Sequence, residues 1–454
     1  MTAHFKFIAV SSVLAGSLYA TNGDNLVGLG AKALALGGTG MAHYNGSESA
    51  TSNPALMSKG KGTQFTFGGT YFTPDVEAKT TGTIGGSNDL TVTSDAKHNV
   101  IPFIALTNNL DNGFSLGLSM YGSAGMGTDW RSDNGAIGNP AIGDMGLYSM
   151  TSSLMLMKFS VPVAYGQDDW SVGVAPVIMY GALGMAFQTA NPAPLHDVGR
   201  GTSGDLGLGY EAGAAYTLKD MGVTLAARYQ SAIMMEYKNQ ISVAAAAFGY
   251  GSNPAAIAGF TDKLEQPAEI GVGLDWTQGD ISLTADFKQI KWADAAGYKD
   301  FGWENQNVYA IGAEYRMDKL ALRAGYNYGK NPIKNNTDTT SVAGGANTNG
   351  DTMNALNHVM FPAVTEKHYT IGAGYQFTKN VGADLALMYA TSPDVTVSAA
   401  TVGLGNLTVT NDQKAIAANL YLAFYSFEPP LWRHSHLTIH SHFSALILKS
   451  NFEV

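Results

Sequence analysis

Residues 308–328 read Val-Tyr-Ala-Ile-Gly-Ala-Glu-Tyr-Arg-Met-Asp-Lys-Leu-Ala-Leu-Arg-Ala-Gly-Tyr-Asn-Tyr. Every second side chain is apolar or aromatic, and the side chains between them are small, polar or charged. The alternation stops at Met317-Asp318-Lys319 and resumes from Leu320 to Tyr328. A period of two is the pattern of a β-strand whose two faces meet different surroundings. The stretch therefore predicts two antiparallel strands joined by a tight turn.

The same pattern recurs from about Gln64 to Phe427, in segments of roughly ten residues separated by turn signals. Six connections are short and carry the Asn, Asp or Gly that tight hairpins need. They lie at 111–113, 167–169, 219–222, 278–280, 317–319 and 378–380. Seven longer polar stretches alternate with them, near 74–98, 124–146, 189–204, 243–265, 297–304, 331–366 and 397–411.

These connections separate about fourteen strands, and both ends of the sheet fall on the short-turn side. We predict an all-β fold, a closed antiparallel transmembrane β-barrel with short periplasmic turns and long outer loops. An even number of strands closes the sheet and leaves no edge in lipid. A soluble sandwich or propeller, the alternative, predicts no aromatic side chains at strand ends. Aromatic residues gather there, at Tyr71, Phe72, Trp170, Tyr216, Trp276, Trp292, Tyr315, Tyr328, Phe377 and Tyr389.

The composition of the 454 residues agrees with an exported membrane protein. Charged residues make up only 14%, against about a quarter in soluble domains, which disfavours a soluble cytoplasmic enzyme. The net charge of -10 and the lack of a basic stripe argue against nucleic acid as a partner. The chain has no cysteine, which excludes disulfides, thiolate nucleophiles and cysteine-bound metal.

The two ends of the chain depart from the strand pattern. Residues 1–20 read as a signal peptide with cleavage after Ala20, and no later stretch is apolar for the roughly 18 residues of a spanning helix. Residues 21–62 are rich in Gly, Ala and Ser and lack period-two apolarity. Residues 428–454 form an atypical tail that indicates read-through or a shifted reading frame. The tail carries a histidine cluster, for which a metal site is the weaker interpretation: His434, His436, His440 and His442.

The segment 21–62 and several strands resemble the FadL/TodX family of outer-membrane transporters of long-chain fatty acids and other hydrophobic compounds. The resemblance rests on the Gly-rich opening of the segment, on Asn53-Pro54-Ala55 before the first strand, and on matches such as Val100–Phe103 and Val161–Tyr165. It covers nearly all of 21–427. It implies that 21–62 folds as a hatch inside a barrel of residues 63–427, with Gly37, Gly38, Asn53, Pro54 and Ala55 as hatch residues.

The resemblance also implies a function and a location. We expect passive uptake of a fatty acid or an aromatic hydrocarbon across the outer membrane of a Gram-negative bacterium, with lateral exit through the barrel wall. The expected partners are the solute, outer-membrane lipid and the barrel assembly machinery. We expect a monomer that needs no cofactor or metal.

The alternation places nine charged side chains on the inner face: Lys158, Glu211, Arg228, Asp275, Asp286, Lys288, Glu314, Arg323 and Asp384. Glu211–Arg228, Asp275–Lys288 and Glu314–Arg323 are predicted as pairs on adjacent strands, and a paired network is how buried charges usually persist. The alternative is that Lys158, Arg228, Lys288 or Arg323 contacts the ligand and binds a fatty-acid carboxylate. Lys32, in the hatch, is predicted to be solvated.

Nothing in the sequence supports catalysis, so we predict that the protein is not an enzyme. His368 is the one barrel histidine on an inward strand position, and no nucleophile motif accompanies it. Two other functions stay open, a general porin for polar solutes and a structural or adhesive barrel. A porin predicts an open lumen, and the transporter predicts a plugged one.

Overall fold

The computed structural model describes residues 21–82, 89–110, 112–131, 147–189, 196–199, 201–251 and 257–424. The predicted signal peptide and the predicted tail lie outside these residues. The residues up to Phe424 belong to one compact unit. No helix in the described part of the chain is long and apolar enough to cross a membrane.

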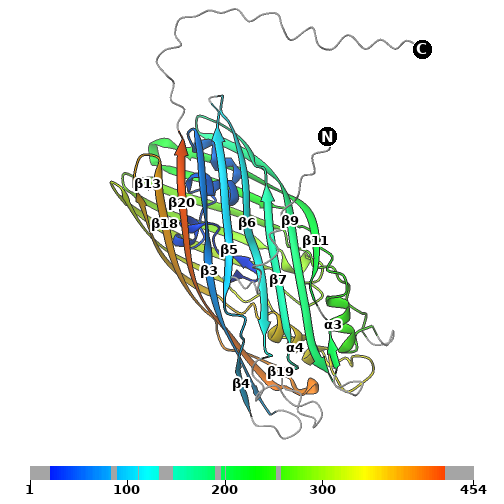
Figure 1. Ribbon diagram of the computed structural model, residues 1–454. Helices are drawn as coiled ribbons and strands as arrows, with labels where there is room; N and C mark the ends of the chain where they lie inside the picture. Colours follow the sequence, from blue (N-terminus) through cyan, green and yellow to red (C-terminus); the bar gives the residue numbers. More distant parts are fainter. Residues whose placement is uncertain are drawn as a thin grey trace, which may run out of the picture. The chain divides into compact units, whose positions relative to one another are not determined.

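The described strands form a closed antiparallel barrel in which each strand pairs with the next along the chain (Figure 1). Closure comes from the first and last strands, which pair from Thr63–Phe424 to Thr81–Gly405. Fourteen strands make the wall when β7 and β8 are counted as one, interrupted at Val161-Pro162. The predicted fold and strand number are confirmed. The wall strands are β3 (Thr63–Thr81), β5 (Asn99–Asn109), β6 (Phe114–Asp129), β7 (Thr151–Ser160), β8 (Val163–Gln167), β9 (Trp170–Thr189), β11 (Ser203–Leu218), β12 (Val223–Gln230), β13 (Glu269–Gln278), β14 (Ile281–Ile290), β15 (Gln306–Met317), β16 (Leu320–Gly329), β17 (Lys367–Gln376), β18 (Val381–Thr391) and β20 (Gly405–Phe424).

All six predicted short turns join neighbouring strands of this wall. Asp168 and Asp318 have φ of 52° and 49°, and Gly222 and Gly279 have φ of 65° and 58°. These left-handed conformations suit Gly and are tolerated by Asp, which is why these residue types mark the turns. The turn chemistry therefore fixed the register of the hairpins.

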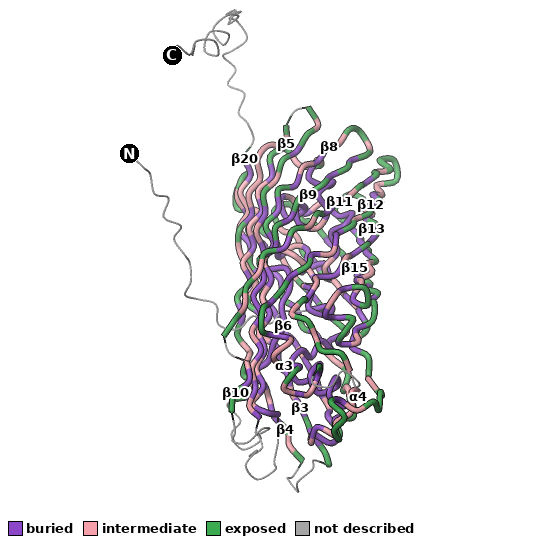
Figure 2. The backbone as a smooth tube through the Cα atoms, turned by 90° about the vertical axis from the view of Figure 1, so that its right-hand side faces the viewer, coloured by how far each residue is buried: buried purple, intermediate pink, exposed green. Residues whose placement is uncertain are grey.

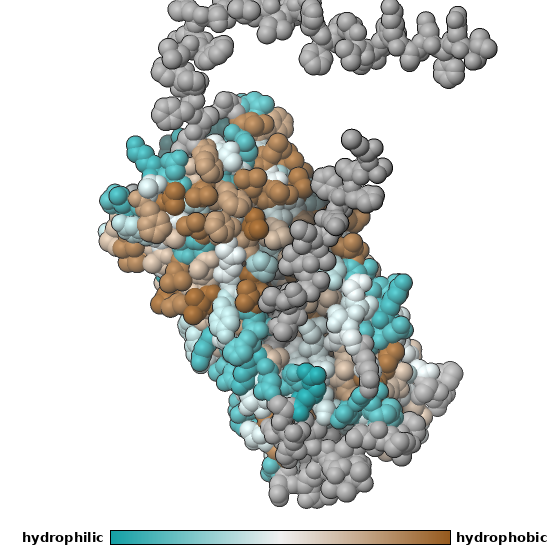
Figure 3. All heavy atoms as spheres, in the orientation of Figure 1, coloured by the Kyte–Doolittle hydropathy of each residue, from teal (hydrophilic) through white to brown (hydrophobic). Residues whose placement is uncertain are grey.

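The alternation of apolar with small or polar residues in the sequence matches the alternation of exposed and buried side chains along the strands. Along β15, Ile311 is 57% exposed on the outer face while Glu314 is 3% exposed inside. Figure 3 shows apolar side chains gathered over the half of the barrel that carries the short turns. The predicted aromatic positions are only partly right, because Phe72 and Trp292 are fully buried in the interior.

At the opposite end, the strands run further than predicted. β3 continues through residues 74–81, which were expected to be loop, and pairs there with β20 and with β4 (Leu90–Thr93). Backbone pairing continues here because buried and exposed side chains still alternate through residues 74–81. The remaining elements at this end are β10 (His196–Val198), α3 (Ile241–Ala247), η5 (Trp292–Asp294), α4 (Asn349–Ala355), η6 (Leu356–Met360), β19 (Val395–Ala399) and η7 (Ala400–Val402), and η4 (Lys219–Met221) lies in a short turn.

Residues 21–62, dark blue in Figure 1, occupy the lumen, where most of them are buried. Along the wall strands, by contrast, buried and exposed residues alternate (Figure 2). Residues 21–62 form short helices and strands rather than barrel strands, because glycine in the interior of a helix or a strand lowers its stability. Their elements are β1 (Thr21–Asn22), β2 (Asn25–Leu26), α1 (Ala31–Ala35), η1 (Gly46–Glu48), α2 (Ser49–Ser52) and η2 (Pro54–Lys59). We call residues 21–62 the hatch segment.

Candidate functional site

The hatch segment lies directly against the barrel wall at several inward-facing glycines of the wall. A Cβ added at Gly325 would lie 2.1 Å from the backbone nitrogen of Gly37, and one at Gly312 would lie 2.7 Å from the carbonyl oxygen of Leu36. The small side of the strand alternation is therefore the surface on which the hatch segment rests. Other inward glycines meet it in the same way: Gly117, Gly166, Gly173, Gly213, Gly271, Gly273 and Gly372.

The glycines named as hatch residues shape the turn that follows α1. Gly37 and Gly38 have φ of 72° and 86°, a region that L side chains rarely adopt. The turn is tied to the wall from both sides. The Gly37 amide donates to Thr370 Oγ1 at 3.0 Å, and Asn327 Nδ2 donates to the Gly37 carbonyl at 3.1 Å.

Asn53, Pro54 and Ala55 lie at the start of η2, and the Asn53 side chain makes contacts on both of its sides. Its Oδ1 accepts from the Ala55 amide at 3.1 Å, and its Nδ2 donates to the Met41 carbonyl at 2.8 Å. The side chain is fully buried and lies against Gly213 of β11. The amide thus joins two parts of the hatch segment at a point where the wall leaves room for it.

The charged side chains predicted to face inward do so, and they form paired networks. Arg228 lies 3.1 Å from Glu211 and 3.9 Å from Glu269, and Lys158 contacts Glu211 at 3.6 Å. The predicted pair Glu211–Arg228 is confirmed. Lys288, however, pairs with Glu269 at 3.4 Å and lies opposite Gly271 in the register, so the predicted pair Asp275–Lys288 is wrong.

Asp275 instead pairs with a hatch residue, which the strand pattern could not show. His43 Nδ1 lies 2.6 Å from Asp275 Oδ1, and His43 Nε2 lies 4.0 Å from Glu314. Asp286 accepts from the backbone amides of Gly40 and Met41 at 2.9 and 3.0 Å. Wall carboxylates therefore hold the hatch segment as well as neutralising wall cations.

The second network surrounds Arg323, which donates to Glu314 at 2.6 Å and to Asp384 at 2.7 Å. This confirms the predicted Glu314–Arg323 pair. Lys32 lies 3.7 Å from Asp384 and 4.7 Å from the centre of the Tyr421 ring. The prediction of a solvated Lys32 is wrong, because α1 packs against the wall and carries the side chain inward.

Two carboxyl groups of the hatch segment are buried deeply enough to change their acidity. Burial raises the pKa of Glu48 to about 7, although Lys32 opposes the shift. Burial also raises the pKa of Asp24 to about 6, against the hydrogen bonds from Tyr298 and Gln266. Both groups hold backbone or side chains in place, since Glu48 accepts from the Lys32 amide at 3.1 Å and from Asn419 at 2.9 Å.

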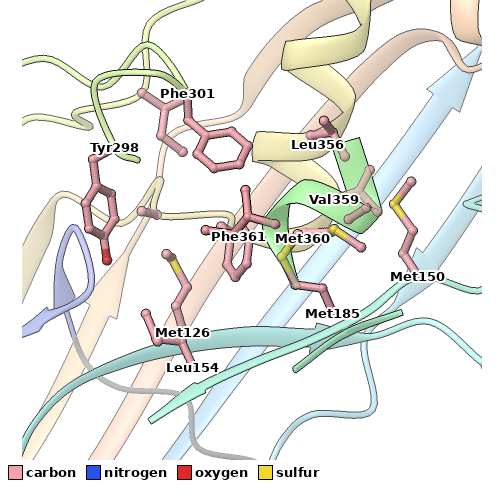
Figure 4. Packing of buried hydrophobic residues seen from close by; sticks show 14 of the residues in the cluster. Met126, Met150, Leu154, Met185, Tyr298, Phe301, Leu356, Val359, Met360 and Phe361 are labelled. Atoms are coloured by element: carbon pink, nitrogen blue, oxygen red, sulfur yellow. The ribbon is translucent and has the colours of Figure 1, made fainter. Parts of the chain in front are cut away.

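An apolar pocket lies at the outer-loop end of the lumen, within the large buried cluster of Figure 4. Its walls come from three strands, from the helices α3 and η6 and from three loops, and no charged side chain lines it in the described part of the chain. Figure 4 shows Phe361 between Phe301 and Met126. The lining residues are Met126, Leu154, Leu183, Ile241, Leu264, Tyr298, Phe301, Trp303, Asn357 and Phe361.

The side chains of this pocket close to a space of about 10 Å³, which holds no more than one water molecule. A larger solute enters only when side chains turn, and methionine and leucine turn readily. The pocket could not be predicted from the sequence, because half of its lining comes from loops without periodicity. The aromatic residues Tyr298, Phe301 and Trp303, close together in a predicted loop, were the available signal.

Close to the pocket, the ladder between β5 and β6 ends. Its last pair is Phe103–Tyr121, and a bulge at Ser123 follows. In the described residues, the rest of β6 pairs with β7 and not with β5. The hatch segment occupies this place, because Asn25 pairs with Ala124 and the Gly125 amide donates to the Asp24 carbonyl at 3.0 Å.

Comparison with protein families gives one match, to the outer membrane protein transport family (OMPP1/FadL/TodX), over residues 8–427. The chain belongs to this family. Membership and the barrel together place the protein in the outer membrane of Gram-negative bacteria. A search of curated proteins finds no match.

Solved structures of this fold agree with the assignment. The chain is similar to the toluene transporter TodX of P. putida, with 18% identity, a TM-score of 0.65 and coverage of 89% of this chain and 100% of that one. A FadL homologue of Pseudomonas aeruginosa has 16% identity and a TM-score of 0.65, with coverage of 89% of this chain and 100% of that one. The toluene transporter TbuX of Ralstonia pickettii has 17% identity and a TM-score of 0.58, with coverage of 88% of this chain and 100% of that one. At these identities, the likeness shows that the FadL/TodX barrel is shared.

Within this family member, the four basic residues considered as ligand contacts all have carboxylate partners. Lys158, Arg228, Lys288 and Arg323 each lie within 3.6 Å of a glutamate or aspartate. None of the four lines the apolar pocket. His368 is fully buried on β17 and faces the hatch segment's first residues.

Proposed function

We propose that this protein carries small, uncharged hydrophobic compounds, aromatic ones above all, into the outer membrane by passive diffusion. The observation that carries the proposal is the apolar pocket, in which four of ten lining residues are aromatic and none is charged. Burial of apolar surface favours such a solute by about 25 cal/mol per Å². Two relatives of the same fold are named as toluene transporters.

A long-chain fatty acid fits the proposal less well. Its carboxylate would need a cation to offset the loss of hydration, and the four basic residues considered as ligand contacts are engaged with carboxylates of the protein. We propose that Lys158, Arg228, Lys288 and Arg323 hold the wall and the hatch segment together and do not bind the solute.

We further propose that the solute leaves sideways between β5 and β6. The end of the ladder after Phe103–Tyr121 supports this exit, since no pairing between two wall strands has to be broken there. Asn25 and Asp24 of the hatch segment fill the place and would have to move. A lateral exit lets the solute enter lipid without crossing bulk water.

The two other functions are supported less well. A general porin needs an open lumen, and here residues 21–62 fill it through contacts with most wall strands. An adhesive barrel gives no reason for a closed apolar pocket beneath the loops. Both alternatives are distinguished from transport by removing the hatch segment.

The test uses a Gram-negative host that lacks its own general porins, with radiolabelled toluene and a labelled long-chain fatty acid at equal concentration. We expect saturable toluene uptake that depends on this protein and little fatty-acid uptake. Deletion of residues 21–50 should leave a folded barrel with raised ion conductance and without saturable toluene uptake. Unchanged conductance together with normal uptake in the deletion variant would contradict the proposal, and saturable fatty-acid uptake alone would reassign the substrate.

A further inference from the structure

Among the described side chains that line the apolar pocket, the amide of Asn357 in η6 has the most unused hydrogen-bonding capacity. The side chain is 2% exposed. Its Oδ1 accepts from Trp303 Nε1 at 3.0 Å, and its Nδ2 donates to the Phe301 carbonyl at 2.8 Å. Because an indole N–H only donates and a carbonyl only accepts, these partners fix which way the amide points.

These two hydrogen bonds use half of the donors and acceptors of the amide. An asparagine side chain offers two N–H groups and two lone pairs, so one of each is open. The other polar groups that line the pocket are used: the Trp303 N–H by Asn357, and the Tyr298 hydroxyl by Asp24 and by Gln266, whose Nε2 lies 3.0 Å away. Among the described side chains that line the pocket, Asn357 is therefore the one that still offers an N–H donor to a solute.

The amide also lies between two of the aromatic walls. Its partners Trp303 and Phe301 are themselves lining residues, and the Trp303 ring meets the Tyr298 ring edge-on at 4.9 Å. A flat ring that enters between these aromatic side chains brings its substituent to the amide. The substituent must be neutral, because no lining residue carries a countercharge.

We infer that the pocket selects aromatic rings that carry one small neutral hydrogen-bonding group, such as a phenolic hydroxyl, and that Asn357 is the residue that recognises this group. The inference rests on the proposed function and narrows its substrate class. In a wholly apolar pocket, a hydroxyl buried without a partner lowers affinity roughly tenfold or more. The open N–H and lone pair of Asn357 remove that penalty.

The test compares 4-methylphenol with 1,4-dimethylbenzene, which have nearly the same shape and differ in one hydroxyl. Uptake of both is measured in the porin-deficient host carrying the full-length protein. In the wild type, we expect 4-methylphenol to be taken up saturably and to compete with labelled 1,4-dimethylbenzene. In Asn357→Leu, the uptake ratio of methylphenol to dimethylbenzene should fall about tenfold.

Met126→Leu is the matched control, since it changes a lining residue while conserving volume and leaves the amide in place. Any effect of this control should fall equally on both uptake rates and leave their ratio unchanged. An unchanged ratio in Asn357→Leu, or a wild type in which methylphenol fails to compete, overturns the inference. If Asn357→Leu does not assemble in the membrane, the competition measured in the wild type still tests the inference. Absence of saturable uptake for dimethylbenzene as well would be a failure of the proposed function instead.

Discussion

Replacing Gly325 by alanine should unseat the hatch segment without altering the outer face of the barrel. The new Cβ would lie 2.1 Å from the Gly37 nitrogen and 2.2 Å from the Leu36 carbonyl carbon. Both are backbone atoms, which cannot rotate away as a flexible side chain does. Carbon atoms in ordinary contact lie about 3.5 Å apart, so the turn after α1 must withdraw by roughly 1.4 Å.

That displacement removes the hydrogen bonds that hold the turn. The bonds from the Gly37 amide to Thr370 and from Asn327 to the Gly37 carbonyl are 3.0 and 3.1 Å long, and neither survives a shift of this size. Each contributes about 1 kcal/mol. The loss of about 2 kcal/mol shifts the equilibrium between seated and unseated hatch roughly thirtyfold.

The assay is ion conductance of the purified variant in planar bilayers, with barrel folding checked by heat-dependent gel mobility. Gly204→Ala is the control, because Gly204 is an exposed glycine of β11 whose added Cβ meets the end of the Tyr180 side chain at 3.1 Å. We expect frequent open events for Gly325→Ala and wild-type behaviour for Gly204→Ala. Equal, low conductance of the two folded variants would refute the reasoning that the wall glycines seat the hatch segment.

Three further predictions test other contacts. Asn53→Ala removes the bonds to Met41 and Ala55, so toluene uptake should fall severalfold at unchanged barrel yield; uptake equal to wild type would remove Asn53 from the hatch's anchors. Ile311→Arg on the lipid face should lower unfolding free energy by about 2–4 kcal/mol in urea titrations in lipid vesicles, and no loss would mean that this face is not in lipid. Because burial raises the pKa of Glu48 to about 7, its contribution to stability is greatest below its ordinary pKa and is lost as pH rises through 7. Glu48→Gln should therefore flatten the dependence of conductance on pH between 5 and 8, and an unchanged slope would contradict this.

The sequence by itself determined the barrel, its strand number and the inward placement of its charges. These depend on short-range rules: alternation has a period of two, and each tight turn is specified by its own few residues. The hairpin at 308–328 shows this, since Glu314 and Arg323 fall on one face of adjacent strands and pair across them. The position of the tight turn alone is enough to make such residues neighbours on adjacent strands.

Only the tertiary structure decided the partners that lie far apart in the chain. Asn25 binds Glu269 across 244 positions, and Asp275 pairs with His43 instead of the expected Lys288. These contacts depend on where the hatch segment folds inside the closed wall, and no local pattern encodes that position. The pocket around Asn357 has the same origin, because three strands, two helices and three loops supply its lining and each is specified by its own local sequence. Closure of the sheet brings them to one point in space, which is why the wall could be predicted from the sequence and the interior could not.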